Sequence, residues 1–200
     1  MKKILHIISS PRSGAASNST QLGNKIIADL QEHYPGSTVW VNNVVEKDYA
    51  HLSNLHIEGY QLTPDNKTPE HRNITLPSDN AVDELSDADI IVISLPVYNF
   101  QLPSALKAWI DHIVRAGRTI TYQTGFPEGL LLNKKVYLAI ASNGVYSDGP
   151  MKAYDFAEPY LRFILGFIGL KDITTFRVEG LGMAGTKEIA LQKGLESVRV

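Results

Sequence analysis

The feature that most constrains the fold is a nearly uninterrupted apolar run in the middle of the chain. Residues Asp89 to Leu95 read Asp-Ile-Ile-Val-Ile-Ser-Leu. A strand that is apolar on both faces needs cover on both sides, which is typical of a central strand in a parallel sheet. Parallel strands need long crossover connections, usually helices. The run therefore predicts an α/β protein.

The other periodic segments complete a sheet of this kind. Further strands are predicted at Lys3 to Ser9, Ser37 to Val44, Lys134 to Ser142 and Asp172 to Glu179. Helices are predicted between them, at Thr20 to His33, Ser78 to Ala88, Ser104 to Arg115, Pro159 to Leu170 and Thr186 to Val198. Right-handed crossovers then give a doubly wound five-stranded sheet, either a dinucleotide-binding fold or a flavodoxin-like fold of order 2-1-3-4-5. Residues 118–131 could add a short hairpin.

A chain of 200 residues, 44% of them hydrophobic, can bury one sizeable core, so we expect a single domain over residues 1–200. Residues 46–77 depart from the pattern, because they contain Pro64, Pro69 and Pro77 and show little periodicity. We expect an irregular excursion or lid there with short helical pieces. Long loops in compact domains are more often functional or mobile than inert.

Composition excludes several kinds of chemistry. The absence of cysteine removes disulfides, thiolate metal sites, Fe–S clusters and cysteine nucleophiles. A formal net charge of −2 gives no reason to expect nucleic acid or an anionic membrane surface as a partner. No metal site is expected, because none of the six histidines has metal-motif spacing: His6, His33, His51, His56, His71 and His112. Any redox chemistry must come from a bound cofactor.

The N-terminal apolar run, Met1 to Ile8, superficially resembles a signal peptide. It is short and meets Ser9-Ser10-Pro11-Arg12 without a cleavage context, so a buried first strand is the better interpretation. No stretch approaches the apolar length of a membrane span. We therefore expect a cytoplasmic protein.

Ligands of doubly wound sheets lie beyond the carboxyl ends of the strands, so three loops are candidates for the site. The first, residues 10–20, is rich in hydroxyl groups and leads from a strand into a helix. Hydroxyl and N–H groups at a helix N-terminus suit a phosphate, although a polar helix start without a ligand has the same composition. Gly14 stands alone and no Gly-Lys-Ser/Thr follows, which weakens dinucleotide and ATP interpretations.

The second loop, Pro96 to Pro103, is stiffened by proline at both ends and carries Tyr98, Asn99 and Phe100 between them. A flat ring needs an apolar face and fixed polar groups along its edge, which this loop could supply. A turn whose aromatic side chains pack onto the core would have the same sequence.

Residues 94–111 carry a resemblance to a known family. They read Ser-Leu-Pro-Val-Tyr-Asn-Phe-Gln-Leu-Pro-Ser-Ala-Leu-Lys-Ala-Trp-Ile-Asp. This resembles the Pro-Met-Tyr-Asn-Phe…Pro…Leu-Lys…Asp signature of the FMN-dependent NADH-azoreductases, which belong to the flavodoxin-like quinone reductases. Further matches follow at Arg115-Ala116-Gly117, Pro127-Glu128-Gly129-Leu130, Asp148-Gly149-Pro150 and Leu165-Gly166-Phe167-Ile168-Gly169. The similarity covers nearly the whole chain and is weakest in residues 46–77.

The resemblance implies bound FMN and assigns residues to it. The family's phosphate-binding positions correspond to Ser10, Ser17, Asn18 and Ser19. Its positions along the isoalloxazine ring correspond to Pro96, Val97, Tyr98, Asn99 and Phe100. Its second turn at the flavin edge, the third candidate loop, corresponds to Ser142, Asn143, Gly144 and Val145.

The third loop departs from the family's usual Ser-Arg-Gly-Gly. Asn143 stands where arginine is expected and Val145 replaces the second glycine, while Tyr146 replaces or crowds a family histidine. A positive charge near the ring stabilises the anionic reduced flavin. The family's fold and cofactor are therefore expected for this chain, whereas the family's flavin potential and substrate preference are not.

The family's members are homodimers with both active sites at the interface, so the resemblance implies a homodimer. Tyr122 and Phe167 match aromatic positions of the substrate pocket, contributed partly by the partner subunit, and Tyr146 is the third expected pocket residue. From periodicity alone, Phe167 would be ordinary helix packing.

The predicted function is an FMN-dependent oxidoreductase that passes two electrons from NADH to quinones and azo compounds. NADH and the acceptor would use one slot in turn, which gives ping-pong kinetics. No catalytic side chain is assigned, because the flavin carries the chemistry. A flavodoxin-type electron carrier is the main alternative, although such carriers are usually strongly acidic. A non-flavin interaction module on the same fold is the second.

Overall fold

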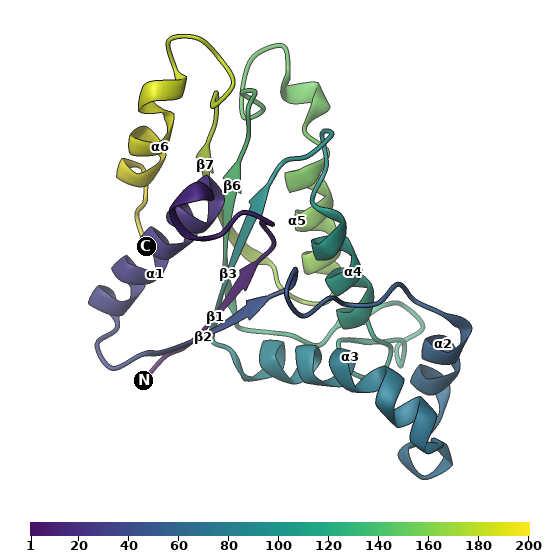
Figure 1. The fold of residues 1–200 in the computed structure, drawn as a ribbon. Coiled ribbons are helices and arrows are strands. Elements are labelled where there is room, and N and C mark those ends of the chain that lie inside the picture. The colour runs from purple at the N-terminus through teal and green to yellow at the C-terminus, as the bar shows by residue number, and fades with distance from the viewer.

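The computed structural model describes residues 1–200 and is built around a five-stranded parallel sheet (Figure 1). The strands are β1 (Lys3–Ile8), β2 (Thr38–Asn43), β3 (Ile90–Pro96), β6 (Lys135–Ala141) and β7 (Asp172–Val178). They lie side by side in the order β2-β1-β3-β6-β7. This confirms the predicted α/β class and the order 2-1-3-4-5.

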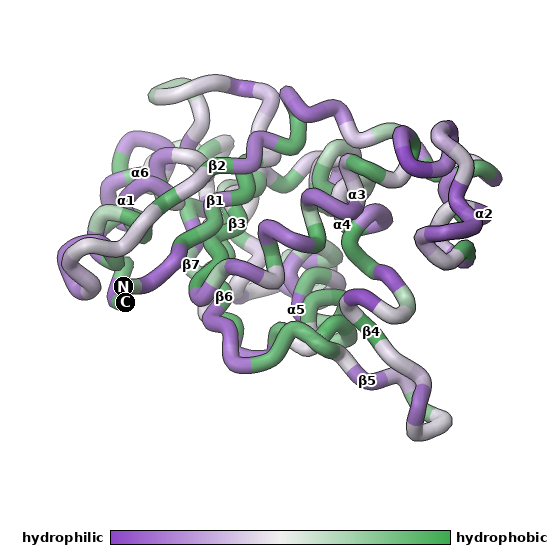
Figure 2. The backbone as a smooth tube through the Cα atoms, turned by 90° about the horizontal axis from the view of Figure 1, so that it is seen from below, coloured by the Kyte–Doolittle hydropathy of each residue, from purple (hydrophilic) through white to green (hydrophobic).

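Helices cover both faces of the sheet. α1 (Asn18–His33) and α6 (Lys187–Glu196) pack on one face, under a cluster that includes Leu22 and Ile26. α3 (Pro69–Asp87), α4 (Ser104–Ile113) and α5 (Ala157–Phe167) pack on the other, around the fully buried Trp109. Seen from below, the hydrophobic segments of β1 and β3 lie between the two helical layers (Figure 2). The central strand is buried at every residue before Pro96, as its apolar run predicts.

The predicted start of one helix, at Ser78, is wrong, because α3 begins at Pro69. Thr68 caps the helix by accepting the N–H of His71 at 3.3 Å. Proline is suited to the first helical position, where its missing N–H would have no intrahelical partner. Pro77 lies inside the helix, which continues through it because the following turns bury an apolar face against the core. A proline that usually ends a helix is thus tolerated here by tertiary packing.

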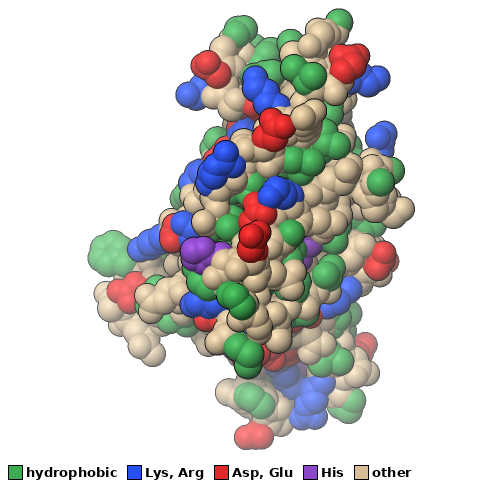
Figure 3. All heavy atoms as spheres, turned by 90° about the vertical axis from the view of Figure 1, so that its left-hand side faces the viewer, with side chains coloured by type: hydrophobic (Ala, Val, Ile, Leu, Met, Phe, Trp, Pro, Cys, Tyr) green, Lys and Arg blue, Asp and Glu red, His purple; other side chains and the backbone are tan.

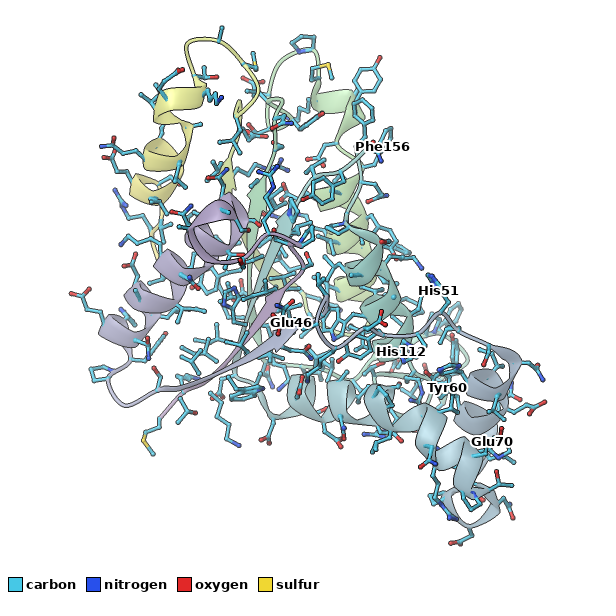
Figure 4. The ribbon with its side chains drawn as sticks, viewed as in Figure 1. Glu46, His51, Tyr60, Glu70, His112 and Phe156 are labelled. Atoms are coloured by element: carbon cyan, nitrogen blue, oxygen red, sulfur yellow. The ribbon has the colours of Figure 1, made fainter.

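Ser78 serves a tertiary contact instead of a cap. Its buried hydroxyl donates to the carbonyl oxygen of His112 and accepts from Nη1 of Arg115, each at 2.5 Å. The Tyr60 hydroxyl of α2 (Asn54–Gln61) lies 3.3 Å from Nδ1 of the same histidine (Figure 4). The guanidinium of Arg115 lies 3.6 Å above the Tyr60 ring. Residues 46–77 therefore contain more regular structure than their sequence predicted. The contacts of Tyr60 with His112 and Arg115 attach this segment to the end of α4.

The remaining elements are short. Three 3₁₀ turns are formed by η1 (Gly14–Ala16), η2 (Pro64–Asn66) and η3 (Lys152–Tyr154). The predicted hairpin is confirmed as an antiparallel pair of β4 (Ile120–Thr121) and β5 (Glu128–Gly129). None of the helices is both long and apolar enough to cross a bilayer. On the face shown in Figure 3, basic and acidic side chains are interspersed.

A buried polar pair lies between β1, β3 and α1. Nε2 of His6 and Oγ of Ser94 are 2.7 Å apart, and both side chains are inaccessible to solvent. Burial lowers the pKa of the His6 imidazole from its ordinary 6.5 to about 4. The folded protein therefore keeps His6 neutral at pH values at which the unfolded chain would protonate it.

This pair predicts an acid-sensitive component of stability. Because the unfolded chain binds a proton below pH 6.5 and the folded chain only near pH 4, stability falls as pH drops through that window. The full loss is roughly 3 kcal/mol. Urea unfolding of wild type and His6→Gln across this range measures it, since glutamine does not titrate. Equal pH slopes for the two proteins would contradict the assignment.

Candidate functional site

The sheet register brings the three predicted loops to one edge. Pro96 at the end of β3 pairs with Ala141 of β6, which pairs with Val178 of β7. The loops are tied where they begin, because Ser9 N–H donates to the carbonyl oxygen of Ser94 at 3.1 Å. The strands β3, β6 and β7 point toward the top of Figure 1, where their loops lie. Convergence at the carboxyl edge thus follows from parallel pairing alone.

The first loop ends in a helix start lined with hydroxyl groups. Ser17 is the N-cap of α1, and its Oγ accepts the N–H of Thr20 at 3.3 Å and its hydroxyl at 2.8 Å. The first N–H groups of a helix have no partner inside it, which leaves those of Asn18 and Ser19 for a ligand. Ser10, Ser17 and Ser19 are all buried.

These groups line a cavity of about 120 Å³, together with Pro96, Val97, Tyr98, Ser142 and Asn143. Buried hydroxyls, helix N–H groups and the positive end of the helix dipole fit a phosphate group. Arg12 also lines the cavity and forms no ion pair with a carboxylate in the chain. Arg12 is not among the site residues predicted from the sequence, although its place in the loop before a helix start was a usable signal.

The second loop turns sharply and places its side chains at the edge of the sheet. The backbones of Tyr98 and Gln101 exchange two hydrogen bonds of 2.9 Å. Between them Asn99 and Phe100 take φ values of 49° and 66°. Asparagine tolerates this left-handed conformation, whereas phenylalanine adopts it rarely, at a cost of about 1–3 kcal/mol. Such strain is concentrated at ligand-binding sites.

A second, larger cavity of about 870 Å³ begins at this loop. Val97, Tyr98 and Asn143 line both cavities, so the two cavities adjoin. Together they make up the groove, which extends from the start of α1 to the start of α4. The larger cavity has enough volume for a flat tricyclic ring, and the amide side chains of Asn99, Gln101 and Asn143 are on its wall. The groove as a whole fits an elongated ligand with a phosphate at one end and an aromatic ring at the other.

Lys107 and Tyr160 also line the larger cavity, and neither is among the site residues predicted from the sequence. A hydrogen bond of 2.6 Å to Asp111 raises the pKa of Lys107, so its ammonium is charged at neutral pH. Lys107 is the only basic side chain along this cavity, whose wall has Asn143 where the family has arginine. The one cation on this cavity wall thus comes from α4 and not from the third loop, and it is paired with the carboxylate of Asp111.

The third loop is fixed by the segment that follows β7. Ser142 donates through its hydroxyl to the carbonyl oxygen of Gly144 at 2.8 Å. The N–H groups of Gly180 and Gly182 donate to the carbonyl oxygens of Gly144 and Asn143 at 3.2 and 3.0 Å. Residues 179–182 are therefore a fourth segment of the site, which no local sequence signal identified.

The three expected substrate-pocket residues lie in different places. Tyr146 packs edge-on against Phe100, with ring centroids 6.2 Å apart, and so reaches the second loop. Tyr122 is exposed in the β4–β5 hairpin, and Phe167 stacks on Phe163 at the carboxyl end of α5. None of the three side chains lines the groove of its own chain.

Fold and groove together define a flavodoxin-like α/β protein with a site for a phosphorylated aromatic ligand. The model of the family described as having a flavodoxin-like fold matches residues 2–200. The chain belongs to this family, and the family resemblance predicted from its loops is confirmed.

The chain is similar over nearly its whole length to enzymes of this family. It is 46% identical over 188 residues to the FMN-dependent NADH:quinone oxidoreductase of Herminiimonas arsenicoxydans, covering 92% of this chain and 89% of the relative. It is 37% identical to that of Beijerinckia indica, covering 99% and 98%. The crystal structure of an azoreductase from Bacillus anthracis superposes with a TM-score of 0.89 at 28% identity, covering 98% of this chain and 96% of that one.

Proposed function

We propose that this chain is an FMN-dependent oxidoreductase that passes two electrons from NADH to quinones and azo compounds. The observation that carries the proposal is the pair of adjoining cavities in the groove, of which the smaller suits a phosphate and the larger suits a flat ring. The relatives named as FMN-dependent NADH:quinone oxidoreductases and azoreductases support the same cofactor, donor and acceptors.

The residues of the groove have distinct tasks in this proposal. Ser10 and the turn from Ser17 to Ser19 would hold the phosphate, and Arg12 would supply a counter-charge to it. Residues 96–100 and 142–145 would lie along the ring and its edge. When bound, FMN supplies the hydride-accepting and hydride-donating chemistry. The protein contributes orientation, exclusion of water and the charge of Lys107.

The proposal includes a homodimer. Tyr122 and Phe167 lie outside the groove of their own chain and would reach the groove of a second copy. Several aromatic side chains near them are exposed, including Phe126 at 77% and Phe163 at 70%. Exposed apolar groups of this size are typical of surfaces that are covered by a partner.

Steady-state kinetics with purified holoprotein test the proposal. One slot used in turn by NADH and a quinone predicts parallel lines when NADH is varied at several quinone concentrations. Intersecting lines would contradict the alternating use of one slot. Very slow NADH oxidation with every quinone and azo dye would favour the electron-carrier alternative, and protein that binds no FMN would favour an interaction module.

A further inference from the structure

We propose that Arg177 is a positioning residue that holds the loop of residues 146–155 against the second loop, beside the larger cavity of the groove. The inference rests on the proposed function, and it adds a residue that lies outside the three loops predicted from the sequence. Arg177 lies on β7, an edge strand of the sheet, with its side chain 12% exposed. An arginine on an edge strand could extend into solvent, so its burial among carboxylates needs an explanation.

The start of the loop is held through Glu179. Nη1 of Arg177 donates to Oε1 of Glu179 at 3.1 Å. The same carboxylate oxygen accepts the N–H groups of Tyr146 at 2.8 Å and Ser147 at 3.0 Å, and Oε2 accepts the Ser147 hydroxyl at 2.5 Å. Two successive backbone N–H groups on one carboxylate fix the direction in which the chain leaves the third loop.

The end of the loop is held through Asp155 and Glu158. Nη2 of Arg177 donates to Oδ2 of Asp155 and to Oε2 of Glu158. Oδ1 of Asp155 accepts the N–H groups of Ala157 and Glu158, both at 3.1 Å, at the start of α5. Figure 4 shows Phe156, the next residue, at the upper end of this helix. One guanidinium therefore joins both ends of the loop.

Arg177 neutralises a cluster of three mostly buried carboxylates, because it forms ion pairs with all of them. The side chains of Asp155, Glu158 and Glu179 are 10, 16 and 11% exposed. Burial raises the pKa of Glu158, but hydrogen bonds from Thr175 and Arg177 outweigh it and hold the pKa below its usual range. Without the guanidinium, three carboxylates would stand close together with one remaining cation, the partly exposed Arg162. Breaking a buried ion cluster from one side is strongly unfavourable.

Two tyrosines of the loop connect the charged cluster around Arg177 with the second loop of the site. Tyr146 and Tyr154 both stand against Phe100, with ring centroids 6.2 and 6.1 Å from it. Phe100 is the strained aromatic residue of the second loop, and its chain neighbours Asn99 and Gln101 line the larger cavity. If the loop loosens, these two tyrosines lose their contacts with Phe100, and the second loop loses its support beside the larger cavity. The phosphate end of the groove keeps its contacts.

The contacts of Arg162 make it a matched control. It donates to Glu158, to the carbonyl oxygen of Ile173 and to the hydroxyl of Thr175, but to neither Glu179 nor Asp155. Arg177→Met and Arg162→Met each remove one arginine from the same cluster. Only the first releases both ends of the loop, so an effect that comes from removing a cation beside Glu158 would appear in both variants.

The experiment compares the holoenzymes of wild type and both variants in quinone reduction, FMN binding and thermal unfolding. We expect Arg177→Met to raise the KM for the quinone by about tenfold, with the dissociation constant for FMN changed by less than about threefold. Arg162→Met is expected to leave both constants unchanged. Arg177→Lys should recover part of the KM, because it restores a cation at this position.

Three results would overturn the proposal. An unchanged KM in Arg177→Met would do so, as would equal changes in both variants, or a KM that rises only together with weakened FMN binding. Should Arg177→Met fail to fold, the same constants are measured for Glu179→Gln, which loosens only the start of the loop. A raised KM for the quinone with unchanged FMN binding is again expected, and an unchanged KM would again overturn the proposal. Wild type without quinone reductase activity would instead contradict the proposed function, so the two failures are distinguishable.

Discussion

Replacing Ser17 with aspartate is expected to raise the dissociation constant for FMN by at least about a hundredfold while leaving the fold intact. Aspartate caps a helix as well as serine does, and a negative charge at a helix N-terminus is favourable, so α1 keeps its cap. The same carboxylate would stand in the cavity assigned to the phosphate. Two unit charges about 4 Å apart repel by about 4 kcal/mol at an effective dielectric constant of about 20, and a hundredfold loss requires only about 2.8 kcal/mol.

Flavin fluorescence titrations measure this effect, and two controls isolate its cause. Riboflavin lacks the phosphate, so its affinity should be equal for wild type and Ser17→Asp. Thr68→Asp introduces the same charge at the N-cap of α3, where Thr68 also accepts an N–H at 3.3 Å, and should leave FMN binding unchanged. Equal losses for FMN and riboflavin would show that Ser17 acts on the shape of the site and not on a phosphate.

Gly23→Ala is expected to destabilise the protein by about 3–5 kcal/mol, a large share of the roughly 5–15 kcal/mol that holds a domain folded. A Cβ at Gly23 would lie 2.0 Å from Oγ of Ser94 and 2.7 Å from Nε2 of His6. These groups are buried and bonded to each other, so the methyl group both overpacks the layer under α1 and separates the pair. Alanine's better helix propensity, worth about 1 kcal/mol, is too small to compensate.

Urea unfolding of three further variants tests this explanation. They are Gly166→Ala, Ser94→Ala and the double variant of Gly23→Ala with Ser94→Ala. Gly166→Ala in α5 meets nothing within 4 Å and should be neutral or stabilising by up to about 1 kcal/mol. The substitution at Gly23 should cost less in a Ser94→Ala background than in wild type, because the nearest clashing atom is gone. Equal costs in both backgrounds would refute the clash with Ser94.

The sheet could be predicted because its signals are local. The apolar run from Asp89 to Leu95 requires cover on both faces, and the alternation with helices then leaves few topologies. The convergence of the loops follows from parallel pairing, so Ser17, Asn99 and Asn143 could be placed at one edge before their contacts were seen. The family resemblance then selected the flavodoxin-like order and the ligand.

The start of α3 could not be predicted from local signals. Pro69 and Pro77 argue for a loop, and only the burial of one face of α3 against the core shows that the helix continues through Pro77. Ser78 has the composition of a cap but bonds to His112, which lies 34 residues further along the chain. Tertiary packing outweighed propensity in both cases.

The residues that hold the loop beside the site could not be predicted from local signals either. Glu179 and Arg177 act on a loop that lies about thirty residues before them, through contacts that exist only once β7 pairs with β6. Lys107 and Arg12 lie in or next to the predicted ligand loops, where only hydroxyl, amide and aromatic groups were predicted to contact the ligand. The sequence signal that could have identified both residues is a charged side chain in or next to a predicted ligand loop.

The most direct test of the central claim is the visible spectrum of the FMN-loaded protein during anaerobic addition of NADH. The groove at the carboxyl edge is proposed to hold a flavin that accepts electrons from NADH and returns them to a quinone. The absorbance of the bound flavin should therefore bleach with about one equivalent of NADH and return when a quinone is added. A bound flavin that stays oxidised in excess NADH would contradict the proposed function.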